Sequence, residues 1–358
     1  MLPLQGIKVV EFAAIGPVPW CGQLLAELGA DVVRIDRPGA EDPAKDTNYT
    51  KGARRSLVLD LKSAPDRDAA LSLAAAADVV VEGLRPGAME RLGLGPAECQ
   101  ATNPRLVYAR MTGWGQDGPL AERAGHDINY IALTGALHAI GIPERPIVPV
   151  NLIGDFGGGS TYLAIGLLAA LLHARTTGQG AVVDAAMVDG TAYLMSSMYS
   201  RHANGLWRDS RASNELDGGA PWYDVYATGD GRFIAVGAVE KQFYSLLVSG
   251  LGFDERELPA RENRDNWPAL RKLFTERFLT KPRDEWASIF EPTDACVTPV
   301  LSLAEAPLHP HNRARSLFRP WQRGHVPMTA PRIGPEQPQI HAPTRSISLR
   351  DVLASWGA

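Results

Sequence analysis

Residues 7–36 read IKVVEFAAIGPVPWCGQLLAELGADVVRID, and this stretch decides the fold. Its two ends, Ile7–Phe12 and Asp31–Asp36, are short runs rich in valine and isoleucine, which is typical of buried β-strands. Between them, residues 20–30 place apolar side chains at the spacing of an amphipathic helix, with Gly29 as the expected end. A strand, a helix and a second strand in this order predict two parallel strands joined by a crossover helix.

The same pattern continues along the chain. Three further short strands are predicted at Ser56–Leu61, Asp78–Glu82 and Leu106–Met111. A long apolar helix is predicted at Phe156–Arg175, ended by Gly178 or Gly180 and followed by a strand-like run at Ala181–Met187. We therefore expect an α/β fold in which the large domain is a Rossmann-like parallel sheet covered by helices.

A second, smaller α+β domain is predicted where the pattern changes at residues 217–221, DGGAP. Tyr223–Ala238 has the alternation of a β-hairpin that turns at residues 229–231, and polar helices carrying Trp267 and Trp286 follow. The predicted organisation is a large domain at residues 1–190, a linker helix at 191–216, the small domain at 217–322, and a C-terminal segment at 323–358 that returns to the large domain.

Composition and charge exclude several classes of protein. With 36 Lys and Arg against 40 Asp and Glu, the formal net charge is −4, which provides no global basic field for nucleic acid. Cys21, Cys99 and Cys296 are too few and too far apart for a disulfide framework or a cysteine-based metal site. The N-terminus has no signal-peptide pattern, and no uninterrupted apolar run is long enough to span a membrane. We expect a cytoplasmic protein without a membrane span and without a metal site.

Familiar catalytic motifs are missing from the sequence. After the first predicted strand the chain reads AIGPVP at residues 14–19, without the Gly-x-Gly-x-x-Gly needed for close approach to a pyrophosphate. This argues against a nicotinamide-dependent enzyme. There is no Gly-x-Ser-x-Gly elbow and no His-Glu-x-x-His, which argues against a serine hydrolase and a zinc protease.

Cationic side chains follow the predicted strands: Arg37 after the second, Lys62 after the third, and Arg85 and Arg91 after the fourth. Open parallel sheets bind ligands at the carboxyl ends of their strands, and guanidinium groups suit phosphates. A ligand with several phosphates would use such a spread. The alternative is that these are solvated side chains at element ends, and position alone favours that alternative.

Two acidic or basic side chains occur in segments suited to proton transfer. His126 lies in AGHDINY at residues 124–130, where it is either a base or a histidine that begins a helix. Asp155 lies in NLIGDFGGG at residues 151–159, just before three glycines. If this turn is helical, Asn151 lies four residues earlier on the same face and could hold the Asp155 carboxylate by a hydrogen bond. The free N–H groups of this helix start could stabilise developing negative charge, such as that of an enolate oxygen. Asp155 could equally be an N-cap, with the glycines serving helix packing.

Glu240 ends a strand-like segment and precedes a predicted helix at Lys241. It is either a carboxylate that begins the helix or the group that orients His126.

Several segments of the sequence resemble one known family. They are ADVVRIDRP at 30–38, RPG at 85–87, GHDINY at 125–130, NLIGDFGG at 151–158, LDGGAP at 216–221 and DACVTPV at 294–300. On these segments the chain closely resembles the α-methylacyl-CoA racemases of the type III CoA-transferase superfamily, over nearly its whole length. Trp20 and Glu215 depart from the pattern of the relatives and bear on the choice of acyl chain.

The resemblance implies an activity and a site. The activity is interconversion of (R)- and (S)-2-methylacyl-CoA by 1,1-proton transfer through an enolate. His126 and Asp155 would be the two acid/base residues, supported by Glu240 and Asn151 respectively. The resemblance implies no cofactor, since coenzyme A is part of the substrate, and it implies an interlocked homodimer. The implied coenzyme A contacts are Arg37, Leu59, Asp60, Leu61, Lys62, Gly83, Leu84, Arg85, Arg91, Gly125, Asp127, Ile128, Asn129 and Tyr130.

Competing functions remain open at this point. Transferases of the same superfamily use an aspartate at the position of Asp155 as a nucleophile. Such transferases usually carry a longer glycine-rich loop in their second half, where this chain has only Gly218 and Gly219 together. A non-catalytic acyl-CoA binder would keep the cationic residues but has no need of His126 and Asp155.

Overall fold

The computed structural model describes residues 2–40, 49, 52, 54–334 and 345–357. The chain forms two compact units. Unit 1 comprises Met1–Ala136, Pro149–Ser196 and Met328–Ala358, and unit 2 comprises Leu137–Val148 and Ser197–Pro327. Residues 137–148, predicted as part of the large domain, group with unit 2. Residues 335–344 of the predicted C-terminal segment lie outside the described residues.

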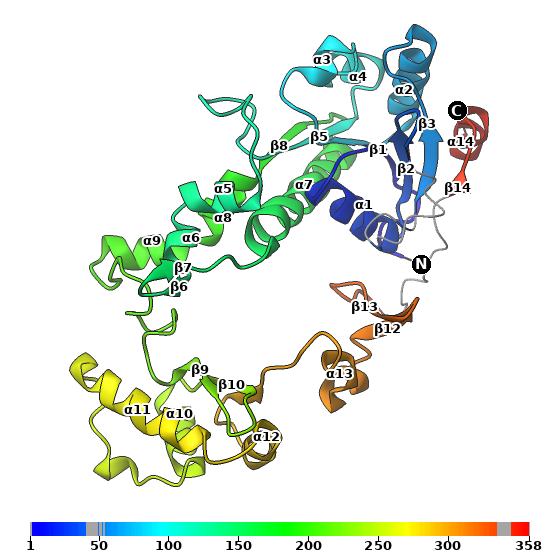
Figure 1. Cartoon of the computed structure of the whole chain (residues 1–358). Helices are drawn as coiled ribbons and strands as arrows, with labels where there is room; N and C mark the ends of the chain where they lie inside the picture. The colour runs from blue at the N-terminus through cyan, green and yellow to red at the C-terminus, as the bar shows by residue number, and fades with distance from the viewer. Residues whose placement is uncertain (1, 41–48, 50–51, 53, 335–344, 358) are drawn as a thin grey trace. The chain divides into compact units, whose positions relative to one another are not determined.

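Unit 1 is built on a seven-stranded sheet with the order β14-β3-β2-β1-β4-β5-β8 (Figure 1). Every pair of neighbouring strands in this sheet is parallel. The strands are β1 (Lys8–Phe12), β2 (Asp31–Asp36), β3 (Arg55–Val58), β4 (Val79–Glu82), β5 (Val107–Thr112), β8 (Val182–Ala186) and β14 (Arg345–Ser346). The order β3-β2-β1-β4-β5 is that of a Rossmann-type doubly wound sheet, which confirms the predicted fold class.

The strands were readable in the sequence because both faces of this sheet are buried. Val9 and Val10 are neighbours on β1, point to opposite faces, and are both fully buried. The face that includes Val9 packs against helices α1 and α7, and the face that includes Val10 packs against α2, α4 and α14. Unit 1 is therefore a three-layer α/β sandwich.

The helical segments of unit 1 are α1 (Pro17–Glu27), α2 (Ala64–Ala76), α3 (Ala88–Arg91), α4 (Pro96–Thr102), α5 (Asp127–Leu133), the π-helix η3 (Leu152–Ser160), α7 (Thr161–Thr177), α8 (Met187–Leu194) and α14 (Leu349–Trp356). The long helix predicted at Phe156–Arg175 is thus two segments, since its first turns have π-helical hydrogen bonding. Gly178 ends it with a φ of 76°, as expected for a glycine after a helix.

One apolar helical stretch, Leu152–Thr177, is long and apolar enough to cross a membrane by length and composition alone. Within unit 1, 44% of an 18-residue window of this stretch is buried. Leu163 and Leu167 of this stretch belong to the core between α7 and the sheet. The described contacts are therefore those of a core helix, and the absence of a membrane span stays a prediction.

Unit 2 contains the predicted hairpin: β9 (Tyr223–Ala227) and β10 (Phe233–Gly237) pair antiparallel, with β11 (Val297–Pro299) on the other side of β10. Its core gathers large aromatic side chains, including Trp222, Phe274 and Trp286. Its remaining elements are α6 (Ala136–Ala139), β6 (Gly141–Ile142), β7 (Arg145–Pro146), α9 (Ser196–Ala203), α10 (Lys241–Gly250), η4 (Glu255–Glu257), η5 (Arg264–Asn266), α11 (Trp267–Phe278), α12 (Arg283–Phe290), η6 (Ala306–Leu308), α13 (Pro310–Ala314), β12 (Phe318–Trp321) and β13 (Gly324–Pro327). Helices α6 and α9 each begin one residue before the bounds of unit 2.

Hydrogen bonds explain why residues 137–148 belong to unit 2. Arg211 donates to the carbonyl oxygens of His138 at 3.1 Å and Ile142 at 3.0 Å. His138 Nε2 lies 3.1 Å from the Asp209 carboxylate. These contacts fasten the β6–β7 hairpin to the segment that follows α9.

Candidate active site

A cavity of about 530 Å³ in unit 1 lies at the point in the sheet where the order of the strands reverses, between β1 and β4. The chain runs outward from β1 through β2 to β3 and then crosses back to β4, so the loops after β1 and β4 face one another. In open α/β sheets this switch point is the ordinary place for a ligand. The cavity is lined by residues of the loops after β1, β4, β5 and β8 and of the segments around α5 and η3: Ile15, Gly16, Pro17, Val18, Gly83, Leu84, Arg85, Pro86, Met111, Thr112, Gly113, Trp114, Ala121, Arg123, Ala124, Gly125, His126, Tyr130, Asn151, Asp155 and Met187.

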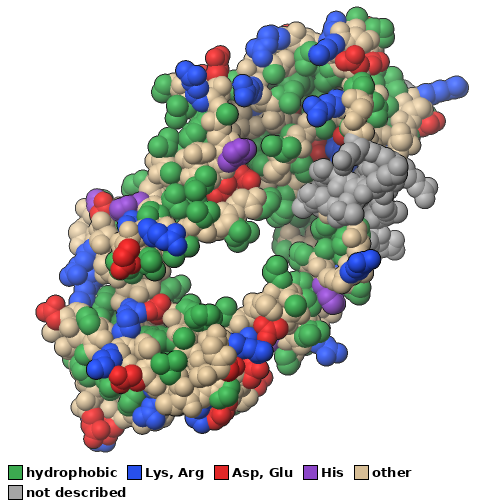
Figure 2. Space-filling view, viewed as in Figure 1, with side chains coloured by type: hydrophobic (Ala, Val, Ile, Leu, Met, Phe, Trp, Pro, Cys, Tyr) green, Lys and Arg blue, Asp and Glu red, His purple; other side chains and the backbone are tan. Residues whose placement is uncertain are grey.

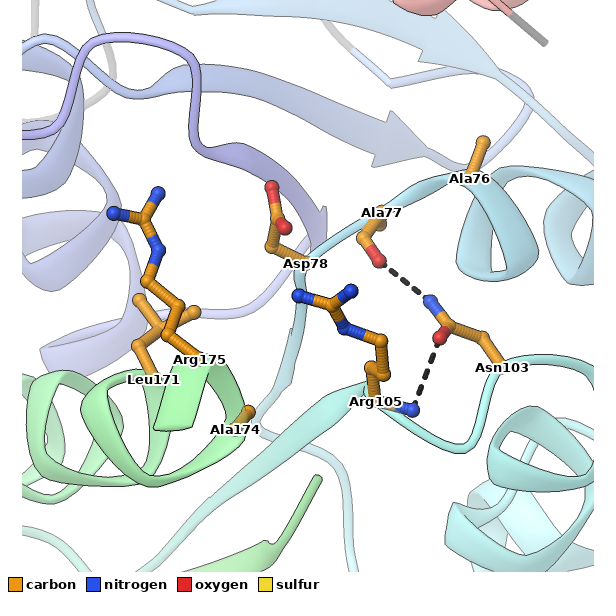
Figure 3. A pocket seen from close by; sticks show the side chains of 8 residues that line it. All are labelled: Ala76, Ala77, Asp78, Asn103, Arg105, Leu171, Ala174 and Arg175. Atoms are coloured by element: carbon orange, nitrogen blue, oxygen red, sulfur yellow. Dashed lines mark hydrogen bonds between the residues drawn. The ribbon is translucent and has the colours of Figure 1, made fainter. Parts of the chain in front are cut away.

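A smaller cavity of about 180 Å³ lies at the amino ends of β4 and β5 of the same sheet (Figure 3). Asp78 precedes β4, Asn103 and Arg105 precede β5, and Arg175 comes from the end of α7. The Asn103 side chain donates to the Ala77 carbonyl oxygen at 2.8 Å and accepts the Arg105 N–H at 3.1 Å, as Figure 3 shows. None of the predicted site residues lines this second cavity, so the larger one is the candidate active site.

His126 lines the larger cavity and is the residue immediately before α5. Its backbone N–H donates to the Asn129 side-chain oxygen at 3.1 Å, which fixes the start of the helix. Its side chain is exposed. The two alternatives left by the sequence are therefore compatible, because His126 begins a helix and also presents its imidazole to the cavity.

Asp155 lies in η3 and is half-buried. The Asn151 side-chain amide donates to Asp155 Oδ2 at 3.0 Å, which is the hydrogen bond predicted from their spacing. The turn before α1 approaches the same carboxylate, since a Cβ placed on Gly16 would lie 3.5 Å from Asp155 Oδ2. Ser160 anchors this arrangement by donating to the Pro17 carbonyl oxygen at 2.8 Å. Asp155 is thus not the N-cap of its helix, and its carboxylate is directed by Asn151.

Asp127 connects the segments that carry His126 and Asp155. Its buried Oδ2 accepts the backbone N–H groups of Gly154 at 2.6 Å and Asp155 at 2.8 Å. Burial raises the pKa of the Asp127 carboxyl, the two N–H groups lower it, and the charge of Asp155 raises it again. Asp127 follows His126 directly, so one carboxylate holds the start of η3 against the start of α5.

The N–H groups at residues 154–158 were expected to stabilise an enolate, and Asp127 engages two of them; for Phe156 that role stays a prediction. Those of Gly154 and Asp155 are occupied by Asp127. Those of Gly157 and Gly158 lie inside η3, where a π-helix pairs each N–H with the carbonyl five residues earlier. No pattern in the sequence indicates this contact, because Asp127 and Gly154 are 27 residues apart.

The glycines after Asp155 serve packing. A Cβ on Gly158 would lie 2.5 Å from Thr191 Oγ1, and one on Gly159 would lie 2.9 Å from Met187 Cγ. Both contacts are with α8, which therefore packs directly on the backbone of η3. Of the two uses of glycine considered from the sequence, helix packing is the one that these contacts support.

Tyr130 forms one wall of the cavity. Its ring meets Trp114 edge to face, with ring centroids 4.7 Å apart. A Cβ on Gly113 or Gly125 would lie within 2.8 Å of the Tyr130 ring, so the ring fits only against glycine at both positions. Burial raises the pKa of the Tyr130 hydroxyl, and the charges of Asp155 and Asp127 add to the effect.

The predicted coenzyme A contacts fall into two groups. Gly83, Leu84, Arg85, Gly125 and Tyr130 line the cavity together with His126, Asn151 and Asp155. The others do not line it, but they follow the strands or belong to α3 and α5: Arg37, Leu59, Asp60, Leu61, Lys62, Arg91, Asp127, Ile128 and Asn129. All of these contacts stay predictions.

Sequence reasoning missed several residues of the cavity. Arg123 lies three residues before His126 and lines the cavity, as Arg85 does. Trp114 and Met187 follow β5 and β8 and give the cavity apolar walls. For the last two the available signal was their position, since Trp114 follows a predicted strand and Met187 is the last residue of another.

Glu240 belongs to unit 2, where it is exposed and immediately precedes α10. Its backbone carbonyl accepts the Tyr244 N–H at 2.9 Å, as expected for the residue that begins a helix. Its predicted action on His126 stays a prediction.

Side chains of opposite charge are interspersed on the surface drawn in Figure 2. On that face, Lys and Arg alternate with Asp and Glu and with hydrophobic side chains, without forming one continuous basic surface. Among the described residues, no group of three or more His, Cys, Asp and Glu side chains is placed to hold a metal ion.

Comparison with known proteins gives the family. Residues 4–346 match CoA-transferase family III. The chain belongs to this family. Two relatives in CoA-transferase family III are named alpha-methylacyl-CoA racemase, which confirms the resemblance seen in the sequence. The human protein is 48% identical over 318 residues and the mouse protein 47% identical over 316, and each alignment covers 88% of this chain and 82% of the relative.

The fold of this family member is also found among solved structures. A CaiB/BaiF family protein from Brucella suis superposes with a TM-score of 0.82 at 25% sequence identity, over 99% of both chains.

Proposed function

We propose that this protein is a 2-methylacyl-CoA racemase. The single observation that carries the proposal is that one cavity at the switch point of the sheet is lined by both His126 and Asp155. The 47–48% identity to two proteins named alpha-methylacyl-CoA racemase supports the same activity. A protein that only binds acyl-CoA needs no pair of proton-transfer groups.

In the proposed reaction the two side chains work on opposite faces of the α-carbon. One removes the α-proton, and the electron pair of the C–H bond passes into the thioester as an enolate. The other side chain, already protonated, delivers its proton to the opposite face. The thioester bond stays intact and no electrons leave the substrate, so we propose that no metal or redox cofactor is needed.

The supporting residues have distinct tasks in this proposal. Asn151 directs the Asp155 carboxylate through the hydrogen bond of 3.0 Å. Glu240 is proposed to orient His126. The phosphates of coenzyme A are proposed to contact guanidinium groups at the carboxyl ends of the strands, including those of Arg37, Arg85 and Arg91.

The test is incubation of one enantiomer of a 2-methylacyl-CoA in D₂O. We expect deuterium to enter the α-position as optical purity is lost. His126→Ala and Asp155→Ala should each abolish racemisation, because each enantiomer needs one group to remove the proton and the other to return it. Full racemisation by either variant would contradict the mechanism.

A CoA transferase is the second candidate, because the chain matches CoA-transferase family III and Asp155 faces the cavity. In that reaction the Asp155 carboxylate would attack the thioester and release the CoA thiolate. Hydroxylamine trapping of an acyl-aspartyl intermediate, together with transfer activity that survives in His126→Ala, would favour the transferase. Loss of deuterium uptake in His126→Ala would favour the racemase.

We also propose a homodimer in the cytoplasm. Apolar side chains of α7, β8 and α8 are exposed in unit 1, including Ile165, Leu172, Val182 and Tyr193 at 47–70%. Exposed apolar surface of this extent is typical of a protein interface. The three cysteines are free thiols, which fits a reducing compartment. Sedimentation of the purified chain tests the dimer, and a monomer at micromolar concentration would contradict it.

A further inference from the structure

Arg110 of β5 connects two carboxylates that lie on either side of one loop. Its Nε lies 3.2 Å from Glu82 Oε1, and its Nη2 lies 2.7 Å from Glu90 Oε1. Glu82 is the last residue of β4, and Glu90 lies in α3. One guanidinium therefore holds both the beginning and the end of residues 82–90.

Glu82 also shapes the turn that follows it. Its Oε2 accepts the Leu84 N–H at 2.7 Å, so the two oxygens bind Arg110 and the turn separately. The side chain is 2% exposed, and burial raises the pKa of its carboxyl while the N–H of Leu84 and the charge of Arg110 lower it. Burying a charged carboxylate costs free energy, which its ion pair and hydrogen bonds must offset.

The turn after Glu82 is also fixed from the opposite side. A Cβ on Gly83 would lie 2.9 Å from Val18 Cγ2 and 3.0 Å from the Cβ of Ala14. Gly83 therefore packs against the loop that follows β1 and against the first turn of α1. The turn is therefore held on one side by Glu82, which forms an ion pair with Arg110, and on the other by the packing of Gly83.

The segment between the two carboxylates borders the candidate active site. Gly83, Leu84, Arg85 and Pro86 line the cavity, and Arg91 follows Glu90. We propose that Arg110 is a positioning residue for coenzyme A: by holding Glu82 and Glu90, it sets the shape in which residues 83–91 bind the phosphates of the ligand. This inference rests on the proposed function only for the identity of the ligand.

The geometry requires arginine. A planar guanidinium carries donors in several directions and can bind two carboxylates at once, whereas a lysine ammonium is a compact charge on a flexible chain. Arg110→Lys therefore keeps the charge but loses the simultaneous hold on both ends of the segment. Arg110→Gln removes the charge as well.

The test measures binding of coenzyme A without turnover, by calorimetry. Both variants should bind coenzyme A roughly 10- to 100-fold more weakly than the wild type, which is the change expected when a hydrogen bond between charged groups is lost. In racemisation assays, KM for a 2-methylacyl-CoA should rise by a similar factor while kcat changes by less than about threefold. With the N-acetylcysteamine thioester, which lacks the phosphates, the wild type and Arg110→Lys should react equally.

A matched control separates positioning from general stability. Arg55 of β3 binds Asp31 at the other edge of the sheet, with Nε 3.0 Å from Asp31 Oδ1, and donates to Ser355 at 3.0 Å. Arg55→Lys should lower the melting temperature without changing coenzyme A affinity. The proposal is wrong if folded Arg110→Lys binds coenzyme A as the wild type does, or if its activity falls equally with both thioesters. Because coenzyme A binding is measured directly, failure of this proposal can be distinguished from failure of the proposed function. In the latter case the wild type would bind coenzyme A but not racemise a 2-methylacyl-CoA.

Discussion

Asp127 Oδ2 accepts the backbone N–H of Asp155 at 2.8 Å. Asp127 is the first residue of α5 and follows His126, so this hydrogen bond joins the backbone beside His126 to that of Asp155, the two proposed proton-transfer residues. Asp127→Ala leaves this N–H and that of Gly154 without their acceptor. Each buried, unpaired N–H costs about 1–3 kcal/mol of unfolding free energy, and a displaced Asp155 should lower kcat by about 10- to 100-fold. Urea unfolding and racemisation rates measure the two effects.

Asp127→Asn is the matched variant, because its amide oxygen can still accept one or both N–H groups. It should recover much of the stability and rate lost in Asp127→Ala. If the alanine variant keeps the wild-type kcat, the contact does not control where Asp155 lies.

Asn151→Ala should slow proton exchange at one enantiomer more than at the other. The substitution removes the donor that lies 3.0 Å from Asp155 Oδ2 and leaves His126 untouched. Deuterium uptake by the enantiomer that Asp155 deprotonates should fall about tenfold, which corresponds to roughly 1.4 kcal/mol. Initial exchange rates of both pure enantiomers in D₂O provide the measurement, and an equal fall in both would count against this role for Asn151.

Gly190→Ala should disrupt the packing of α8 on η3. A Cβ on Gly190 would lie 1.9 Å from the Gly158 carbonyl oxygen, and a backbone atom cannot move aside as a side chain can. We expect a loss of about 1–3 kcal/mol in stability together with reduced activity, since η3 carries Asp155. Gly324→Ala is the control, because no atom lies within 4 Å of its Cβ position. Thermal unfolding of both variants tests the difference, and equal melting temperatures would contradict it.

The cysteines should differ in reactivity. Burial, with the charge of Glu11 adding to it, raises the pKa of Cys21 to about 12, and burial raises the pKa of Cys99 to about 12. Cys296 is exposed. The thiolate is the reactive form, so a thiol reagent at pH 8 should label only Cys296 in the folded protein and all three cysteines after denaturation. Peptide mapping identifies the labelled residue, and rapid labelling of Cys21 would refute the prediction.

The Arg283–Glu305 pair of unit 2 should contribute to stability in a pH-dependent way. Arg283 Nη2 donates to Glu305 Oε1 at 2.8 Å, and this bond, with those from Ser302, lowers the pKa of the Glu305 carboxyl to about 2. The contribution is therefore complete above the unfolded pKa and is lost as the pH falls toward 2. The difference in melting temperature between the wild type and Glu305→Gln should shrink below about pH 4.3. A difference that stays constant down to pH 2 would speak against the pair.

Much of unit 1 could be predicted because parallel strands buried on both faces leave a clear sequence pattern. Asp31–Asp36 agrees residue for residue with β2. The third strand is shorter than predicted and ends at Val58, although the Leu59 N–H still bonds to the Asp36 carbonyl oxygen at 2.9 Å. Periodicity identifies a run of apolar residues but does not fix the last hydrogen bond of a ladder.

The candidate site was only partly predictable. The spacing of Asn151 and Asp155 was sufficient to predict their hydrogen bond, since both lie on one helical turn. The contact of Asp127 with Gly154 and Asp155 joins residues 27 and 28 positions apart, and no local pattern indicates it. The π-helical turns of η3 were also missed, because the apolar pattern of residues 152–160 does not distinguish a π-helix from an α-helix; η3 contacts α8 and the start of α1, which are distant in the sequence.

The strand β14 and helix α14 have a consequence for how the protein is made. Arg345 and Ser346 extend the sheet beside β3, and Trp356 covers part of the core and binds Asp31 through its indole N–H at 2.8 Å. Asp31 is translated 325 residues before Trp356. At roughly 5–20 residues per second, the nascent sheet waits on the order of tens of seconds for these contacts, with apolar surface exposed throughout. The sheet and the core of unit 1 are therefore completed only after synthesis reaches α14.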